Sequence, residues 1–428
     1  MSAARPSGEF QSERRAARRP AFLAPWRARA LVLLALIILL LSPFSGLLAA
    51  AEGETRSAYK TTSGPKWRVI YVEGGPFHDY RSVLWGFIEG LRAKGLLAKG
   101  PPPAPAAGVD NKPLWDYLAL EAKSDVLEFL PDGFYSADWD PARREEVKAQ
   151  ALQRIAERRD VDLVLAFGTW AGADLAGEIQ GVPLMSVGAT DPVNSGISLA
   201  AADSGRDNVH VHVDEGNIER QLRLFYDLFK FKRLGIPVDM AESGQDSVGL
   251  AAIMSIADEL NFTVIACDGG LEKADREASF AWLIDCAREL SQKSDAIYLT
   301  ANNDVIHERM DEILAPIVAA SLPSFSQGGS RDTQAGILMS VAEADFKDIG
   351  FFEADVAQRI LEGEKPRDIN QIYLPPLVLA LNLKMAMSVG WTPPFEVLVA
   401  VDELYRDMAF RANPSLYREL REDDFPRE

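Results

Sequence analysis

One short loop of this chain combines three residue types that suit the binding of a small organic molecule. Gly168, Thr169 and Trp170 directly follow the apolar run 162–167. The glycine lets the backbone approach a ligand closely, the threonine adds a hydroxyl group, and the tryptophan adds a ring on which a flat ligand can stack. The same tryptophan could instead pack on the protein surface, and the sequence leaves both interpretations open.

Two further loops have a similar character. Gly75, Pro76 and Phe77 follow the apolar run 67–73 and provide a second aromatic ring, with an ordinary turn as the alternative. Asp191 follows a third such run, and its carboxylate could pair with the ammonium group of a ligand or only form the Asp-Pro turn. We therefore predict that these loops recognise a small molecule.

Catalysis, metal binding and nucleotide binding find little support in the sequence. No Gly-x-Ser-x-Gly motif supplies a nucleophile, and the two glycines at 74 and 75 lack the pattern and the lysine of a phosphate-binding loop. His210 and His212 would share one face of an extended strand, as metal ligands can, but no third ligand stands at a useful spacing. We expect neither enzymatic activity nor a cofactor or metal ion.

Alternating strand-like and helix-like segments predict the elements that position these loops. Apolar runs lie at residues 67–73, 126–130, 162–167, 183–187, 233–238, 263–266 and 296–299. Helical spacing of apolar residues marks the segments between them, for example at 84–91. This alternation indicates an α/β fold with parallel sheets covered by helices on both faces. The carboxyl ends of such strands meet at one edge, where helix N-termini offer free N–H groups to an anionic group.

Size and charge limit the possible functions. The chain has 428 residues, of which 47% are hydrophobic, enough for two packed domains. Its formal net charge is −18. Such an acidic surface repels phosphate backbones and anionic lipid headgroups, so we expect no binding to nucleic acid or to membrane surfaces. We also expect a monomer.

The N-terminal residues 1–51 have the layout of a secretory signal. A cluster of arginines precedes the apolar run 30–41, and small residues follow at 49–51. The apolar run is shorter than the ~20 residues that a transmembrane helix needs. We therefore expect the rest of the chain to lie outside the cytoplasm, in the periplasm, with an uncleaved N-terminal anchor as the alternative.

Three other features concern the organisation of the chain. The proline-rich segment 100–108 predicts an exposed excursion from the first domain, and residues 406–428 form a charged tail. Cys267 ends an apolar strand, and Cys286 lies on the helix-like segment that follows. In an oxidising compartment the two could form a disulfide, and two buried free thiols are the alternative.

A series of short motifs gives the chain a resemblance to a known family. The motifs are the Gly-Thr turn at 168–169, Thr-Asp-Pro-Val at 190–193, Asn-Asn at 302–303, Gly-Glu-Lys-Pro at 363–366 and Asn-Leu-Lys at 382–384. With them, the chain resembles the substrate-binding proteins of ABC transporters, and more narrowly the branch associated with tryptophan and tyrosine uptake. The resemblance covers nearly all of the chain after the N-terminal signal.

The resemblance implies two doubly wound parallel-sheet lobes of the periplasmic binding protein type I fold, joined by several chain crossings around a ligand. The first lobe would comprise residues 66–208 and about 340–375, and the second residues 209–330 and about 376–405. Polar strand-end loops of the second lobe would add ligand contacts, with capping or turn formation as the alternative. The residues concerned are Ser243, Gln245, Asn302, Asn303, Gln327 and Gly328, with Asp345 near the hinge.

The function that this resemblance implies is solute binding outside the cytoplasm. The two lobes would close on a small organic ligand, such as an aromatic amino acid, and deliver it to an ABC permease and its ATPase in the inner membrane. The same closed form could instead be recognised by a periplasmic sensor system. A secreted α/β enzyme is the third possibility, and the missing catalytic residues disfavour it.

Overall fold

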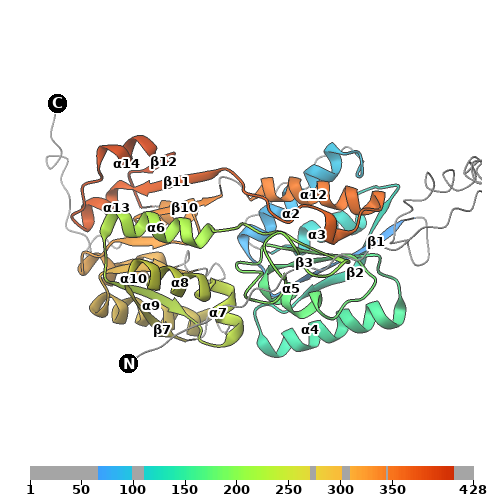
Figure 1. The fold of residues 1–428 in the computed structure, drawn as a ribbon, viewed down its shortest axis with the longest axis horizontal. Coiled ribbons are helices and arrows are strands. Elements are labelled where there is room, and N and C mark those ends of the chain that lie inside the picture. The colour runs from blue at the N-terminus through green and yellow to red at the C-terminus, as the bar shows by residue number, and fades with distance from the viewer. Residues whose placement is uncertain (1–65, 99–109, 270–275, 301–308, 344–345, 409–428) are drawn as a thin grey trace, which may run out of the picture. The chain divides into compact units, whose positions relative to one another are not determined.

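The computed structural model describes residues 66–98, 110–269, 276–300, 309–343 and 346–408. These residues form two lobes, each built on one β-sheet (Figure 1). The predicted signal, the proline-rich excursion and most of the charged tail lie outside the described residues. Within the described ranges, no helix combines the length and the apolar character needed to cross a bilayer.

The first lobe contains a sheet of five parallel strands in the order β2-β1-β3-β4-β5. The strands are β1 (Trp67–Glu73), β2 (Leu127–Ser136), β3 (Leu163–Phe167), β4 (Leu184–Val187) and β5 (Val209–Val211). β3 and β4 are buried along their whole length. Their continuous apolar sequences suit this position, because helices cover both faces of the sheet.

Alternate residues of β1 face two different cores, as the pleat of a strand requires. Val69 and Tyr71 pack under α2, α3 and α12, whereas Ile70 and Val72 pack under α4 and α5. The helices are α2 (His78–Ala93), α3 (Lys112–Leu120), α4 (Pro141–Gln153), the π-helical turn η2 (Arg154–Arg158), α5 (Gly168–Ala176) and α12 (Lys347–Glu362). α2 and α12 approach closely because a glycine lies at their contact: a Cβ atom on Gly86 would stand 2.7 Å from the Lys347 Cα.

The second lobe contains a sheet of seven strands in the order β12-β11-β10-β9-β8-β6-β7. The strands are β6 (Arg233–Val238), β7 (Thr263–Asp268), β8 (Ala296–Leu299), β9 (Ser324–Ser326), β10 (Met339–Glu343), β11 (Leu377–Asn382) and β12 (Glu403–Tyr405). The helices are α6 (Asn217–Phe229), α7 (Glu242–Val248), α8 (Leu250–Leu260), α9 (Arg276–Lys293), α10 (Met310–Ala319), α11 (Ser330–Ala335), α13 (Leu383–Ser388) and α14 (Phe395–Ala400), and the 3₁₀ turn η4 (Pro366–Asp368) follows α12. Buried residues from both sides of the sheet form one large core.

The predicted α/β fold with parallel sheets in two lobes is confirmed, with one antiparallel pair, β10 and β11. Two expected boundaries differ from the sheets. Residues 209–211 form β5, which pairs with β4 in the first lobe. Residues 339–343 form β10, which pairs with β9 in the second. A strand of three residues resembles an extended crossover in sequence, so the division expected at 208 lies a few residues before the end of β5. The return to the first lobe, expected at about 340, comes after β10.

β2 extends beyond the predicted strand 126–130. Pro131, Asp132 and Gly133 have the composition of a turn, yet the strand continues through Ser136. Its register against β1 shifts between Val69 and Tyr71, which marks an irregularity in the pairing. β2 is an edge strand, where a proline and extra residues are tolerated because one side of the strand has no partner to lose.

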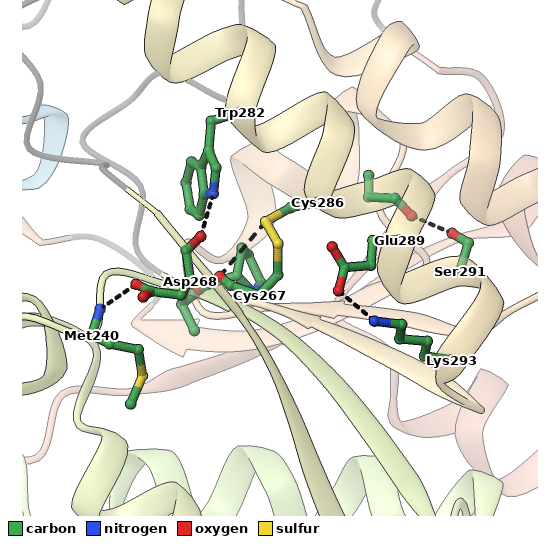
Figure 2. Close-up of a disulfide and its surroundings, with 11 residues drawn as sticks. Met240, Cys267, Asp268, Trp282, Cys286, Glu289, Ser291 and Lys293 are labelled. Atoms are coloured by element: carbon green, nitrogen blue, oxygen red, sulfur yellow. Dashed lines mark hydrogen bonds and ion pairs between the residues drawn. A yellow bond between two sulfur atoms is a disulfide. The ribbon is translucent and has the colours of Figure 1, made fainter.

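The two cysteines form a disulfide between β7 and α9, which decides between the two alternatives that the sequence left open. The Cα atoms of Cys267 and Cys286 lie 5.7 Å apart. Figure 2 shows the bridge together with Trp282, whose indole N–H donates to the Asp268 carbonyl at 3.1 Å. The same turn of α9 is therefore held to the end of β7 by one covalent and one polar contact.

Removal of this disulfide should lower the free energy of unfolding by about 3 kcal/mol. The bridge joins residues 19 positions apart, and a loop of this size restricts the unfolded chain by about that amount. Urea unfolding of the Cys267→Ser/Cys286→Ser double variant, compared with oxidised and reduced wild-type protein, measures the effect. A double variant as stable as the oxidised protein would contradict a stabilising role.

Candidate functional site

The carboxyl ends of four strands in the first lobe bring the predicted loops together. Glu73, the last residue of β1, lies in register with Ser136 of β2 and Phe167 of β3, and Phe167 lies opposite Val187 of β4. The loops that follow these strands therefore emerge side by side at one edge of the sheet. Three of them are the loops that the sequence singled out.

Gly168 and Thr169 begin α5 directly after β3 and are buried. Gly168 has a φ of +83°, a conformation that favours glycine. α5 is nine residues long and, among the described residues, its N-cap has no side-chain hydrogen bond. Its first N–H groups therefore point toward the edge where an anionic group could accept from them.

Trp170 is buried, with 2% of its surface exposed. The Arg144 guanidinium from α4 lies 4.6 Å from the centre of the ring. Arg144 is held there by a two-point ion pair with Asp174, with distances of 2.9 and 3.0 Å. This environment supports the packing interpretation of Trp170, and its contact with a ligand stays a prediction.

The loop after β1 carries Gly75, Pro76 and Phe77. Gly75 is buried, whereas Pro76 and Phe77 are half-buried. The Phe77 ring packs edge-to-face on Tyr80, with ring centres 5.2 Å apart. Phe77 is also the N-cap of α2, so the segment is at once a turn and a carrier of an aromatic ring at the edge of the sheet.

The loop after β2 adds a residue that the sequence analysis missed, Trp139. Its indole lies on the loop after β1: a Cβ atom on Gly75 would stand 2.6 Å from the ring, and one on Gly74 would stand 2.9 Å from it. The indole N–H donates to the Pro76 carbonyl at 2.9 Å. Asp138 and Trp139 both have left-handed φ angles, +50° and +59°. Such angles cost about 1 kcal/mol or more in a residue other than glycine.

Asp191 forms the turn that its sequence suggested. The carboxylate accepts hydrogen bonds from the backbone N–H of Asn194 at 3.1 Å and from its side-chain amide at 2.6 Å. Asp191 also lines a groove of about 580 Å³ with three other acidic residues, Asp214, Glu215 and Glu219. Arg220 neutralises part of this charge through an ion pair with Asp214 at 2.6 Å, and the other carboxylates favour a cationic group.

Two of the predicted residues of the second lobe, Gln245 and Gln327, make hydrogen bonds at the ends of α7. The Gln245 side-chain amide donates to the Met240 carbonyl just before the helix at 2.7 Å. That of Gln327, after β9, donates to the Val248 carbonyl at the helix end at 3.3 Å. The backbone N–H of Gly328 donates to the Ser326 hydroxyl at 2.9 Å. Both glutamines thus have a structural partner, and ligand contact stays a prediction for all three residues.

Other predicted contacts cannot be placed. Ser243 lies on α7, but its side chain is outside what the structure describes, and Asn302, Asn303 and Asp345 lie outside the described residues. The Thr190 hydroxyl, next to Asp191, donates to the Ser247 carbonyl at 2.8 Å. This hydrogen bond links the loop after β4 to α7.

Glu73 is a buried acidic residue beneath the site. One of its carboxyl oxygens accepts from the Tyr71 hydroxyl at 2.7 Å and from the Asn111 side-chain amide at 2.6 Å. Burial raises the pKa of Glu73 from 4.5 to about 7, although these hydrogen bonds oppose the shift. The carboxyl group therefore titrates close to neutral pH.

Glu73→Gln should change how stability depends on pH. Between pH 4.5 and 7 the folded protein holds a proton on Glu73 that the unfolded chain has lost, so the stability of the wild-type protein falls as the pH rises through this window. The loss from this group amounts to about 3 kcal/mol. Glutamine does not titrate, so the stability of the variant relative to wild type should rise by that amount. Urea unfolding of both proteins at pH 4.5, 6 and 8 tests this. A constant difference in unfolding free energy between them at the three pH values would contradict the prediction.

His210 and His212, the histidine pair that the sequence raised as possible metal ligands, pack inside the first lobe. Both are buried, and the His210 Nε2 lies 3.0 Å from the Asn370 carbonyl. Among the residues that the structure describes, no three histidine, cysteine, aspartate or glutamate side chains are arranged to hold a metal ion. His210 lies on β5 and His212 directly after it, and the Phe352 ring of α12 packs near both of them.

Comparison with known proteins gives a family and a fold. The family model "ABC transporter substrate binding protein" matches residues 136–404. The tyrosine-binding protein of Clostridioides difficile (strain R20291) is 20% identical over 275 residues, which cover 61% of this chain and 74% of that protein.

Two solved structures resemble this one along almost their whole length. A conserved domain protein from Vibrio cholerae O1 biovar El Tor has a TM-score of 0.60 and 19% identity, and the match covers 79% of this chain and 99% of that chain. An ABC domain from Streptococcus pneumoniae in complex with L-Trp has a TM-score of 0.58 and 17% identity, with coverage of 78% and 99%. At this identity the structural similarity concerns the fold.

Proposed function

Because the chain belongs to the ABC transporter substrate-binding protein family, we propose that it captures an aromatic amino acid or a similar small organic solute and delivers it to a membrane permease. Proteins of this family act outside the cytoplasm and bind small molecules. The N-terminal signal predicted from the sequence agrees with such a location, in the periplasm. The site-forming loops are those that follow β1, β2, β3 and β4.

The observation that carries this proposal is the convergence of unlike groups at the carboxyl edge of the first sheet. The N-terminus of α5 offers N–H groups to a carboxylate. Asp191, in the loop after β4, offers a carboxylate to an ammonium group. Trp139 and Phe77 offer aromatic surfaces that are half-buried. An amino acid with an aromatic side chain has one group for each of these.

The ligands named for two related proteins support the same ligand class. The Clostridioides difficile relative is named as a tyrosine-binding protein, and the Streptococcus pneumoniae structure holds L-Trp. Permease and ATPase would be the partners of the ligand-bound form. A periplasmic sensor that recognises the same form is the second candidate, and genes for a permease or a histidine kinase beside this one would separate the two. A secreted enzyme is the third, and conversion of a bound compound would establish it.

A melting screen of the full chain tests the proposed function. The compounds are the amino acids, aromatic acids, nucleosides and small sugars. A ligand present at about 100 times its dissociation constant should stabilise the folded protein by about 2.7 kcal/mol. We expect the largest shift with an aromatic amino acid, recovered chemically unchanged. A shift only with sugars or nucleosides would reject the ligand class, and no shift with any compound would count against solute binding.

A further inference from the structure

We propose that Trp139 is the surface on which the first lobe stacks its ligand, and that it selects aromatic over aliphatic ligands. This inference rests on the proposed function and names the residue that would determine its specificity. The sequence suggested Trp170 and Phe77 for this role and did not single out Trp139. Trp170 is buried, whereas Trp139 is half-buried.

One face of the Trp139 ring is seated on backbone without side chains. The nearest ring atoms to a Cβ built on Gly75 are Cδ1, Cδ2 and Cγ, at 2.6 to 2.7 Å, and a Cβ built on Gly74 would stand 2.9 Å from the Cζ3 atom. The indole therefore lies against both glycines, and any larger residue at either position would displace it. Two consecutive glycines after β1 thus have a specific use, which is to accept an aromatic ring.

The orientation of the ring is fixed by a polar contact as well. The only hydrogen-bond donor of the indole is used by the Pro76 carbonyl at 2.9 Å. The left-handed backbone at Asp138 and Trp139 turns the side chain back over the loop after β1. A ring held in this way offers its remaining surface to a ligand with little loss of side-chain entropy on binding.

Trp139 differs from its aromatic neighbours in exposure. Trp170, Phe167 and Tyr80 are 2, 2 and 7% exposed, so they form the support of the cluster. Trp139 is half-buried and packs on Trp170 edge-to-face, with ring centres 5.6 Å apart. The centre of its ring also lies 6.4 Å from the centre of the Tyr80 ring. Trp139 is therefore an outer ring on a rigid aromatic base, at the edge where the loops converge.

Calorimetric titration of the full chain with L-tryptophan, L-tyrosine and L-leucine tests this role. Trp139→Ala should weaken binding of both aromatic amino acids about tenfold or more, by analogy with the loss of other stacking surfaces, and change L-leucine binding less than twofold. Gly75→Ala should act in the same direction, because the added methyl group overlaps the ring. The double variant Trp139→Ala/Gly75→Ala should bind as weakly as Trp139→Ala alone, because Gly75→Ala acts by displacing the Trp139 ring.

Trp85→Ala is the matched control. Trp85 lies on α2, is half-buried, and packs on the same core as Trp139, so its loss perturbs the lobe from a helical position outside the loops. We expect aromatic binding to be unchanged in this variant. Gly75→Ala keeps the test decisive if Trp139→Ala does not fold, because its backbone φ is not in the left-handed region.

The outcomes separate this inference from the proposed function. Wild-type protein that binds none of the three amino acids would reject the proposed ligand class and the role of Trp139 with it. Wild-type binding of L-tryptophan or L-tyrosine that survives in both Trp139→Ala and Gly75→Ala would leave the function standing and overturn the role of Trp139. If Trp139→Ala lowers the affinity for L-leucine as much as the affinity for the aromatic amino acids, Trp139 does not select between them.

Discussion

Trp170→Ala is expected to lower the free energy of unfolding by about 3 to 5 kcal/mol, the usual range for removing a buried tryptophan. The ring is 2% exposed and lies between Trp139 and the guanidinium of Arg144. Its removal leaves a cavity beneath Gly74 and takes the aromatic partner from a cation held by an ion pair. Urea unfolding monitored by circular dichroism measures the loss. Trp170→Phe, which keeps an aromatic ring, should lose less.

Ligand titration of the same variant distinguishes the two interpretations that the sequence left open. A ring that stacks directly on the ligand would contribute about 1 to 3 kcal/mol of binding free energy. A ring that supports the fold and Trp139 without touching the ligand should add no further loss of affinity in the Trp139→Ala background, once incomplete folding is accounted for. Full stability with reduced affinity would contradict the burial seen here and return Trp170 to the binding surface.

The strands could be predicted from the sequence because burial on both faces leaves a strong pattern. β1, β3, β4 and β6 are short apolar runs between helical segments, and all four lie where the pattern placed them. Their parallel pairing then follows from the intervening helices. The three loops at one edge of the first sheet follow in turn, because they directly succeed β1, β3 and β4.

Trp139 could not be predicted in the same way. The turn-like residues 131–133 seemed to end the strand, so Trp139 was not expected in a loop at a strand end. Only the edge position of β2 allows the strand to continue through Phe134 to Ser136. The apolar residues that resume at 134 were the available signal. The sequence Asp-Trp-Asp-Pro that follows, ahead of α4, marks the end of the strand.

The orientation of Trp170 depends on a contact that is distant in sequence. Its position after β3 is predictable, but the side of α5 that it faces is set by Arg144, which α4 brings over the ring. The role of Gln327 has the same origin, because its partner is the Val248 carbonyl at the end of α7. Residue type and spacing predict which loops meet, whereas the direction of each side chain requires the packed structure.

A second large effect is expected in acid, from His210 and His212. Both are buried beside α12, and burial lowers the pKa of His210 from 6.5 to about 3 and that of His212 to about 4. Since Nε2 of His210 must donate to the Asn370 carbonyl, the neutral ring leaves Nδ1 as an acceptor, 3.7 Å from the Glu353 carboxyl group. Burial raises the pKa of Glu353 well above its usual range. The pair is therefore neutral in the folded protein.

These shifts have a definite sign. Below pH 6.5 the unfolded chain takes up protons on both histidines while the folded protein does not, so the stability that they contribute is present above pH 6.5 and is lost as the pH falls. By pH 4 each histidine should account for a loss of about 3 kcal/mol. Glu73 and Glu353 act in the opposite direction over part of the range, so wild-type stability alone does not isolate the histidines.

Comparison of two variants isolates the contribution of a histidine to the pH dependence of stability. His212→Gln should flatten the dependence of the unfolding free energy on pH between 6.5 and 4 by about 1.4 kcal/mol per pH unit, the slope of one proton. Val211→Ala, a buried change between the two histidines, should lower stability at every pH and leave the slope as in wild type. Urea unfolding at pH 7, 6, 5 and 4.5 measures both slopes. If His212→Gln and Val211→Ala give the same slope, His212 does not remain neutral on folding. The acid sensitivity of the first lobe would then have to come from other groups.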